Sequence, residues 1–110
     1  ILRLKALLVS AGKGGINNEI VSCQMIKNDL YFGMTNSDEV RCLQEFLKKE
    51  GPTVYPEGLI TGNFLSLTQS AVIRFQEKYA KEILIPLGLD RGTGFFGSLS
   101  RNVANRLLGS

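Results

Sequence analysis

The chain of 110 residues contains no histidine and no tryptophan, and it has only two cysteines and three prolines. Without histidine, imidazole-based catalysis and every zinc site that needs a histidine ligand are excluded. Two cysteines alone also cannot form a structural zinc site. No stretch approaches the roughly 20 apolar residues of a membrane-spanning helix. We therefore expect no metal, no cofactor and no membrane insertion.

Hydrophobic residues make up 44% of the chain, which is ordinary for a globular protein, so a single packed domain is expected. Thirteen basic and ten acidic residues give a scattered net charge of +3. Because the basic residues do not concentrate on one expected helix, we expect no nucleic-acid partner. The chain begins at Ile1 and shows no signal peptide. We expect a fragment or a processed product that is attached to further domains.

Residues 58–79 form the stretch around which the chain is organised. A short apolar entry, residues 60–62, leads into a glycine turn, and residues 66–79 then show helical periodicity. Ser66 is predicted to cap this helix, and Gln69 completes an S-x-x-Q capping box. The apolar residues at helical spacing, which predict one buried face, are Ala71, Val72, Phe75 and Tyr79.

The same pattern recurs 32 residues later. Residues 93–100 align with residues 61–68, so that threonine, glycine, phenylalanine, serine and leucine match in order. Ser98 is accordingly predicted to cap a last helix. A glycine turn, an aromatic residue, a cap and a helix therefore make a supersecondary unit that is used twice in one small domain.

Two further helices are predicted on the N-terminal side. Asn36 or Ser37 caps the helix whose apolar face starts at Val40, with Glu39 as the reciprocal partner of Asn36. Residues 1–11 predict a first helix. The fold class is therefore all-α: a compact orthogonal three-helix bundle with an additional N-terminal helix and glycine-rich turns. Residues 1–29 are expected to form the N-terminal helix and lead-in, and residues 30–110 the domain.

Four segments follow one another along the chain: D-E-V-R-C-L-Q-E-F-L, G-L-I-T-G-N-F, A-V-x-x-F-Q and the second turn G-F-F-G-S-L-S, which begin at residues 38, 58, 71 and 94. In this order they resemble the bacterial peptidoglycan-binding domain family. The resemblance covers about residues 30–108. It departs from the family pattern at Asn36, Leu65 and Ser100. Leu65, which stands where the family usually has glycine, is expected to avoid positive φ or to accept strain of roughly 1 kcal/mol.

The resemblance implies a three-helix, non-catalytic module, not an enzyme, that tethers a larger secreted or envelope protein to the cell wall. The implied partner is the glycan or the stem peptide of peptidoglycan, and the implied location is extracellular or in the cell wall. The alternative is a degenerate family member that acts as a protein–protein interaction or spacer domain. The carboxylates are scattered, and their spacing indicates no pair that could hydrolyse a glycosidic bond.

Five residues are the candidates for ligand binding. Asn63 and Gln69 could bond sugar hydroxyls or amides, and Arg74 could pair with a carboxylate. Tyr55 and Tyr79 are the aromatic residues expected to reach solvent, where either could stack on a sugar face. Each of these side chains also has a purely structural interpretation, as a turn, helix or core residue.

Two glutamines and two cysteines complete the candidates. Gln44 and Gln76 are predicted to be buried amides that bond loop backbone, with recognition of a sugar or peptide as the alternative. The extracellular setting implied by the resemblance favours a disulfide between Cys23 and Cys42. The alternative is a pair of reduced, buried cysteines.

Overall fold

The computed structural model describes residues 23–109, so the helix predicted at residues 1–11 lies outside the described residues. Helices account for all the regular structure of this range, and the prediction of an all-α fold is confirmed. Extended backbone pairs at one antiparallel bridge, between Leu30 and Phe96. The elements in order are α1 (Asp38–Lys49), α2 (Ser66–Lys78), α3 (Ala80–Ile83), the 3₁₀ helix η2 (Ile85–Leu87) and α4 (Ser98–Leu108).

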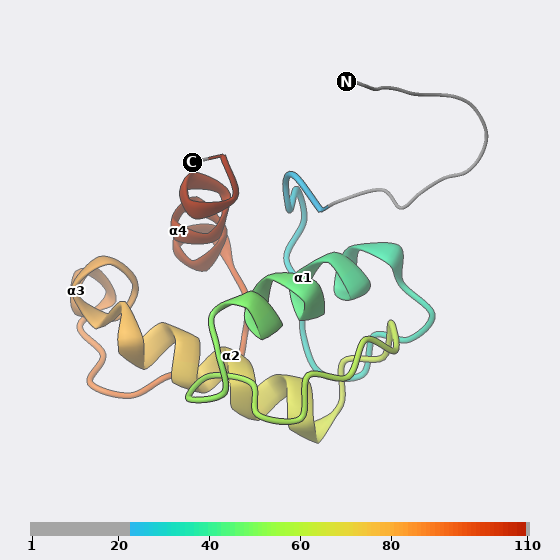
Figure 1. The fold of residues 1–110 in the computed structure, drawn as a ribbon. Coiled ribbons are helices and arrows are strands. Elements are labelled where there is room, and N and C mark those ends of the chain that lie inside the picture. Colours follow the sequence, from blue (N-terminus) through green and yellow to red (C-terminus); the bar gives the residue numbers. More distant parts are fainter. Residues whose placement is uncertain (1–22, 110) are drawn as a thin grey trace.

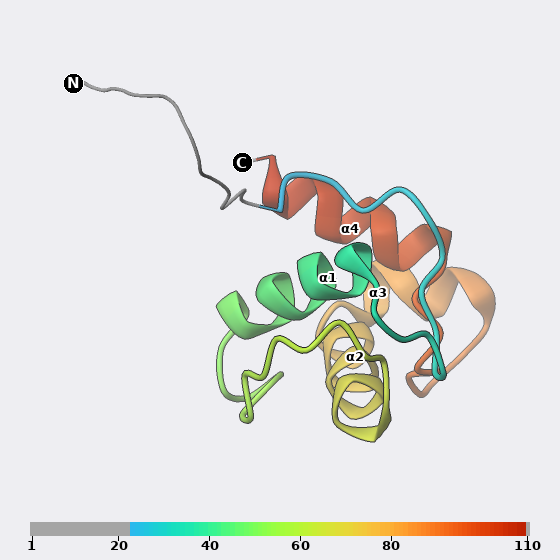
Figure 2. The ribbon, with the colours of Figure 1, turned by 90° about the vertical axis from the view of Figure 1, so that its right-hand side faces the viewer.

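The three longer helices enclose one apolar core. Figures 1 and 2 show α1 between α4 and α2, with the lead-in segment, residues 23–37, running beside α4. The core combines both halves of the internal repeat with two residues of the lead-in, Ile26 and Leu30. The predicted division at residues 29 and 30 stays a prediction, but Ile26 is packed within the domain core. The largest buried aromatic residues of the core are Phe64, Phe75 and Phe96.

Helix α1 begins at the predicted cap. The Ser37 hydroxyl accepts a hydrogen bond from the Val40 N–H at 3.1 Å, and the preceding residue, Asn36, has a left-handed backbone, with φ 51°. The reciprocal cap by Glu39 is wrong. Its carboxylate instead accepts hydrogen bonds from the lead-in segment, which folds back over the start of α1.

The caps predicted for α2 and α4 are also wrong. The N-cap residues are Leu65 (φ −118°, ψ −156°) and Gly97 (φ −99°, ψ −157°), and neither helix has a side-chain cap. The Leu65 carbonyl already accepts the first helical hydrogen bond, from the Gln69 N–H. Ser66 and Ser98 therefore stand one position too late to cap. Because Leu65 is extended, it avoids the positive-φ strain that a residue at this position could incur.

Helix α2 covers the predicted stretch, residues 66–79, except for its last residue. The helix ends at Lys78, and Tyr79 leaves helical geometry with ψ 40° before the short helix α3 begins. The apolar connection after α3 contains η2, which ends at Gly88 in the left-handed conformation. The polypeptide thereby turns back toward α4.

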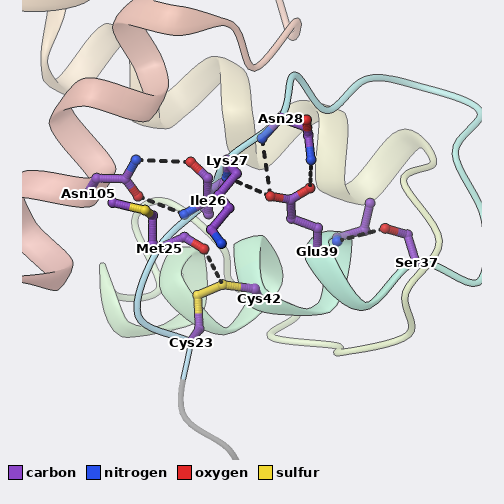
Figure 3. Close-up of a disulfide and its surroundings, with 10 residues drawn as sticks. Cys23, Met25, Ile26, Lys27, Asn28, Ser37, Glu39, Cys42 and Asn105 are labelled. Atoms are coloured by element: carbon purple, nitrogen blue, oxygen red, sulfur yellow. Dashed lines mark hydrogen bonds between the residues drawn. A yellow bond between two sulfur atoms is a disulfide. The ribbon is translucent and has the colours of Figure 1, made fainter.

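The lead-in segment is linked to the first and the last helix of the domain, α1 and α4. A disulfide joins Cys23 to Cys42 of α1 (Figure 3), so the predicted pairing is confirmed. The Asn105 side chain of α4 accepts a hydrogen bond from the Ile26 N–H at 2.8 Å and donates one to the Ile26 carbonyl at 2.9 Å. A side-chain amide therefore pairs with the backbone of Ile26 as a neighbouring strand would.

Candidate functional site

Gln44 of α1 builds the first turn, residues 61–64. Its side-chain carbonyl accepts hydrogen bonds from the N–H groups of Thr61 at 2.8 Å and Gly62 at 3.0 Å. Its amide group donates to the Thr61 hydroxyl, the Asn63 carbonyl and the Thr68 hydroxyl, at 3.0 to 3.2 Å. Because Gln44 is buried and fully engaged with the turn, the structural interpretation of this residue is confirmed.

Gln76 of α2 builds the second turn, residues 93–96, in the same way. Its carbonyl accepts hydrogen bonds from the N–H groups of Thr93 at 2.8 Å and Gly94 at 3.0 Å. Its amide group donates to the Thr93 hydroxyl, the Phe95 carbonyl and the Ser100 hydroxyl. The glycines of the two turns, Gly62 and Gly94, both have φ 83°, a value that side chains disfavour. The sequence repeat is therefore a structural repeat.

Each turn opens beside the start of a helix, and a cleft lies there. The first cleft has a volume of about 270 Å³ and lies between the loop after α1 and the start of α2. Its walls combine leucine side chains with hydroxyl groups and the Asn63 amide. The lining residues are Tyr55, Leu59, Thr61, Asn63, Leu65, Ser66, Leu67 and Thr68.

The second cleft, of about 320 Å³, lies at the start of α4. Seven of its lining residues stand 32 positions after residues of the first cleft, from Leu87 opposite Tyr55 to Ser100 opposite Thr68. The two clefts are therefore products of the same repeated unit. The second is lined by Gln76, Ile83, Leu84, Leu87, Thr93, Phe95, Gly97, Ser98, Leu99 and Ser100.

Two positions of the turn carry different side chains in the two clefts. The first has Asn63 and Leu65, whereas the second has Phe95 and Gly97. A Cβ atom at Gly97 would lie 3.1 Å from the Phe95 ring, so glycine makes room for that ring. The outer part of the ring stacks on Tyr31, with 5.8 Å between centroids and 10° between planes.

The structure brings Tyr55 and Asn63 together in the first cleft. The expectation that Tyr55 reaches solvent is wrong, because the residue is 3% exposed and its hydroxyl donates to the Leu59 carbonyl at 2.5 Å. The Asn63 side-chain oxygen accepts a hydrogen bond from the Asn36 N–H at 3.0 Å. Asn63 therefore helps to hold the turn as well as line the cleft.

The other three candidate residues lie outside the lining of both clefts. Gln69 packs beside Gly94 of the second turn. Arg74 donates a hydrogen bond to the Val54 carbonyl at 3.1 Å and so supports the loop after α1. Their roles in ligand binding stay predictions.

Tyr79 lies at the end of α2, where its hydroxyl donates to the Glu50 carboxylate at 2.9 Å. Lys78 bonds the same carboxylate oxygen at 3.0 Å. Burial and the hydrogen bond to Glu50 raise the pKa of the Tyr79 hydroxyl. The pKa of Lys78 is also raised, mainly by its hydrogen bond to Glu50. These residues join α2 to the end of α1, and their ligand role stays a prediction.

Sequence reasoning missed the second cleft, although the signal was present. The 32-residue offset places Phe95 opposite Asn63 and Leu99 opposite Leu67, so any site proposed at the first turn has a counterpart at the second. Residues 23–109 contain no group of three or more side chains that could hold a metal ion. Within the same range, no helix is long and apolar enough to span a membrane.

Residues 36–80 match the family model of the peptidoglycan binding domain. Comparison with curated proteins and with solved structures gave no match. The matched residues include α1, the first turn and α2, together with every residue that lines the first cleft. The resemblance to the peptidoglycan binding domain family is thereby confirmed over residues 36–80.

Proposed function

We propose that the chain is a non-catalytic module that binds peptidoglycan through the first cleft and tethers a larger secreted protein to the cell wall. One observation carries this proposal: all eight residues that line the cleft lie within the segment matching the peptidoglycan binding domain. The helix, turn and helix that match the family model therefore coincide with a hollow on the surface.

The chemistry of the cleft suits this ligand. Peptidoglycan presents sugar hydroxyls and N-acetyl groups, which need hydrogen-bonding partners and some apolar contact. The cleft offers the amide of Asn63 and the hydroxyl of Ser66 beside the side chains of Leu59 and Leu67. A few polar groups on an apolar wall are typical of sites for small neutral ligands.

Two further features support a binding role outside the cell. Glycoside hydrolysis requires two carboxylates that flank the scissile bond, whereas no carboxylate lines the first cleft. The disulfide between Cys23 and Cys42 is consistent with an oxidising, extracellular setting. Tethering requires that the module be joined to another domain, which is part of this proposal.

The test is co-sedimentation with purified insoluble peptidoglycan, with cellulose as the control polymer. Leu67 is 43% exposed, so Leu67→Glu places a charge at the first cleft without burying it in the core. We expect retention to fall at least tenfold. Leu89→Glu is the matched control, because Leu89 is 38% exposed and lines neither cleft.

Two results would contradict the proposal. If the wild-type chain is not retained on peptidoglycan, the module does not bind the wall, and the spacer or protein-interaction alternative is favoured. If it is retained and both glutamate variants behave alike, the wall is bound elsewhere than at the first cleft. Urea unfolding of each variant shows that the domain is folded in the assay.

A further inference from the structure

Both clefts are uncharged. No aspartate, glutamate, lysine or arginine lines either of them, although these residues make up 21% of the chain. A ligand carboxylate that enters an apolar cleft loses hydration and needs a cationic or strongly hydrogen-bonding partner. Two arginines lie near the first turn or its loop, but neither lines the cleft. A Cβ atom at Gly62 would lie 2.9 Å from the guanidinium carbon of Arg41, and this arginine is paired with Asp38 at 2.7 Å. Arg74 bonds the Val54 carbonyl. The ligand groups that fit these clefts are therefore neutral.

One side chain of α2, Gln69, connects the segments that form the two clefts. A Cβ atom at Gly94 would lie 2.8 Å from Cγ of Gln69, so the second turn packs against this side chain. Thr68, which precedes Gln69, lines the first cleft, and Phe95, which follows Gly94, lines the second. Gln69 thus links the helix that borders the first cleft to the turn that borders the second. A polymer whose units repeat offers two equivalent groups to such a pair, which raises avidity without a new kind of contact.

The second cleft adds an aromatic face. Phe95 is 48% exposed although it is held against Tyr31, itself 48% exposed. The hydroxyls of Thr93 and Ser98 lie in the same lining. A flat apolar ring beside hydroxyl groups suits a pyranose, which has an apolar face and a rim of hydroxyls.

From these three observations we infer that the two clefts are paired subsites for the N-acetylglucosamine units of the glycan strand. These are the sugar units of peptidoglycan that carry no carboxyl group, and the stem peptide is not recognised. This inference rests on the proposed function, because it assigns the chemical class that the wall-binding site takes. It also adds the second cleft, which lies beyond residues 36–80 for most of its lining.

The experiment uses three soluble probes: a β-1,4-linked hexamer of N-acetylglucosamine, the corresponding glucose hexamer and a free stem peptide. Each is tested by calorimetric titration and as a competitor for retention on insoluble peptidoglycan. We expect only the N-acetylglucosamine hexamer to bind and to release the protein. Because no charge takes part, its affinity should change less than twofold between low and high salt.

Phe95→Ala tests the second cleft, and Phe32→Ala is the matched control. Phe32 is 53% exposed and lines neither cleft, so it reports the general effect of removing an exposed phenylalanine ring. We expect Phe95→Ala to lower the affinity for the N-acetylglucosamine hexamer at least fivefold. Phe32→Ala should change this affinity less than twofold. Thermal unfolding of both variants confirms that they are folded.

The possible failures are separate. Retention on peptidoglycan that the stem peptide reverses and the hexamer does not would overturn this inference and leave the wall-binding function standing. If Phe95→Ala binds the hexamer with the affinity of the wild type, the assignment of the second cleft as a subsite is wrong. Absence of retention on intact peptidoglycan would overturn both the proposed function and this inference.

Discussion

Gln44 and Gln76 stand 32 residues apart and make the same five hydrogen bonds to two different turns. The residue 32 positions further, in α4, is Leu108. A buried glutamine amide therefore occurs in α1 and α2, each of which is followed by such a turn. The equivalent position in α4 is apolar. The two glutamines hold the turns that shape the clefts.

Gln44→Leu should unfold the domain more easily because it leaves buried polar groups of the first turn without partners. The N–H of Gly62 and the hydroxyl of Thr68 both lose their bonds to Gln44. We expect a loss of at least about 2 kcal/mol in the free energy of unfolding, measured by urea denaturation. Gln24→Leu, at an exposed position, is the control. An equal effect of the two substitutions would show that water can replace the buried amide.

Because of Glu39, the free energy of unfolding should depend on pH in the acid range. Burial tends to raise the pKa of its carboxyl, but hydrogen bonds from Asn28 and Lys27 and the positive charge of Arg101 outweigh this and lower the pKa from its ordinary 4.5. A lowered folded-state pKa contributes stability that is present above 4.5 and lost as the pH falls through the folded-state value. Glu39→Gln should therefore be destabilising at pH 7, by roughly 1 kcal/mol.

The check is the difference in unfolding free energy between wild type and Glu39→Gln as a function of pH. We expect the difference to be constant from pH 7 down to about 5 and to shrink at lower pH, where the wild-type carboxyl is protonated. Glu57→Gln, in the exposed loop after α1, should show no such change. A difference that stays constant below pH 4 would contradict the role assigned to Glu39.

Reduction of the Cys23–Cys42 disulfide should destabilise the domain and loosen the lead-in segment. The cysteines are 19 residues apart, and closing a loop of this size contributes about 3 kcal/mol in the chain-entropy model. We expect this loss in urea denaturation with reductant, and equally in the Cys23→Ser, Cys42→Ser double variant.

Hydrogen exchange locates the effect of that reduction. The Ile26 N–H, which bonds Asn105, should exchange faster once the disulfide is open, whereas the Gly94 N–H, which bonds Gln76, should keep its protection relative to global unfolding. Faster exchange at both sites in equal measure would mean that the disulfide stabilises the domain as a whole and does not act on the lead-in segment.

Periodicity predicted the helices well because their apolar faces are local patterns. The cap of α1 is Ser37, one of the two residues predicted for it, and Gln44 is buried as predicted. The caps of α2 and α4 were misplaced by one residue, because each turn is shaped by a glutamine of the preceding helix, 17 residues away, and not by the local serine. Local sequence does not contain that constraint.

The clefts were harder to predict for a related reason. Tyr55 looked exposed in a loop of polar and turn-forming residues, but the loop closes over its ring and the hydroxyl bonds Leu59. The partners of Glu39 and Asn105 lie in the lead-in segment, 11 to 79 residues away, and no periodic pattern links them. The repeat was visible in the sequence, yet its consequence, a second cleft at Phe95, follows only from the folded turn.

The amide pair between Ile26 and Asn105 has a mechanical consequence. It places the point where the chain enters the domain next to the helix by which it leaves, so the two ends are joined by a short path through two hydrogen bonds. The Arg101–Asp29 ion pair at 2.9 Å reinforces the same path. A pulling force applied between the ends would load these contacts together with the Cys23–Cys42 disulfide, which carries part of the force directly to α1. Neither path runs through the turns that shape the clefts.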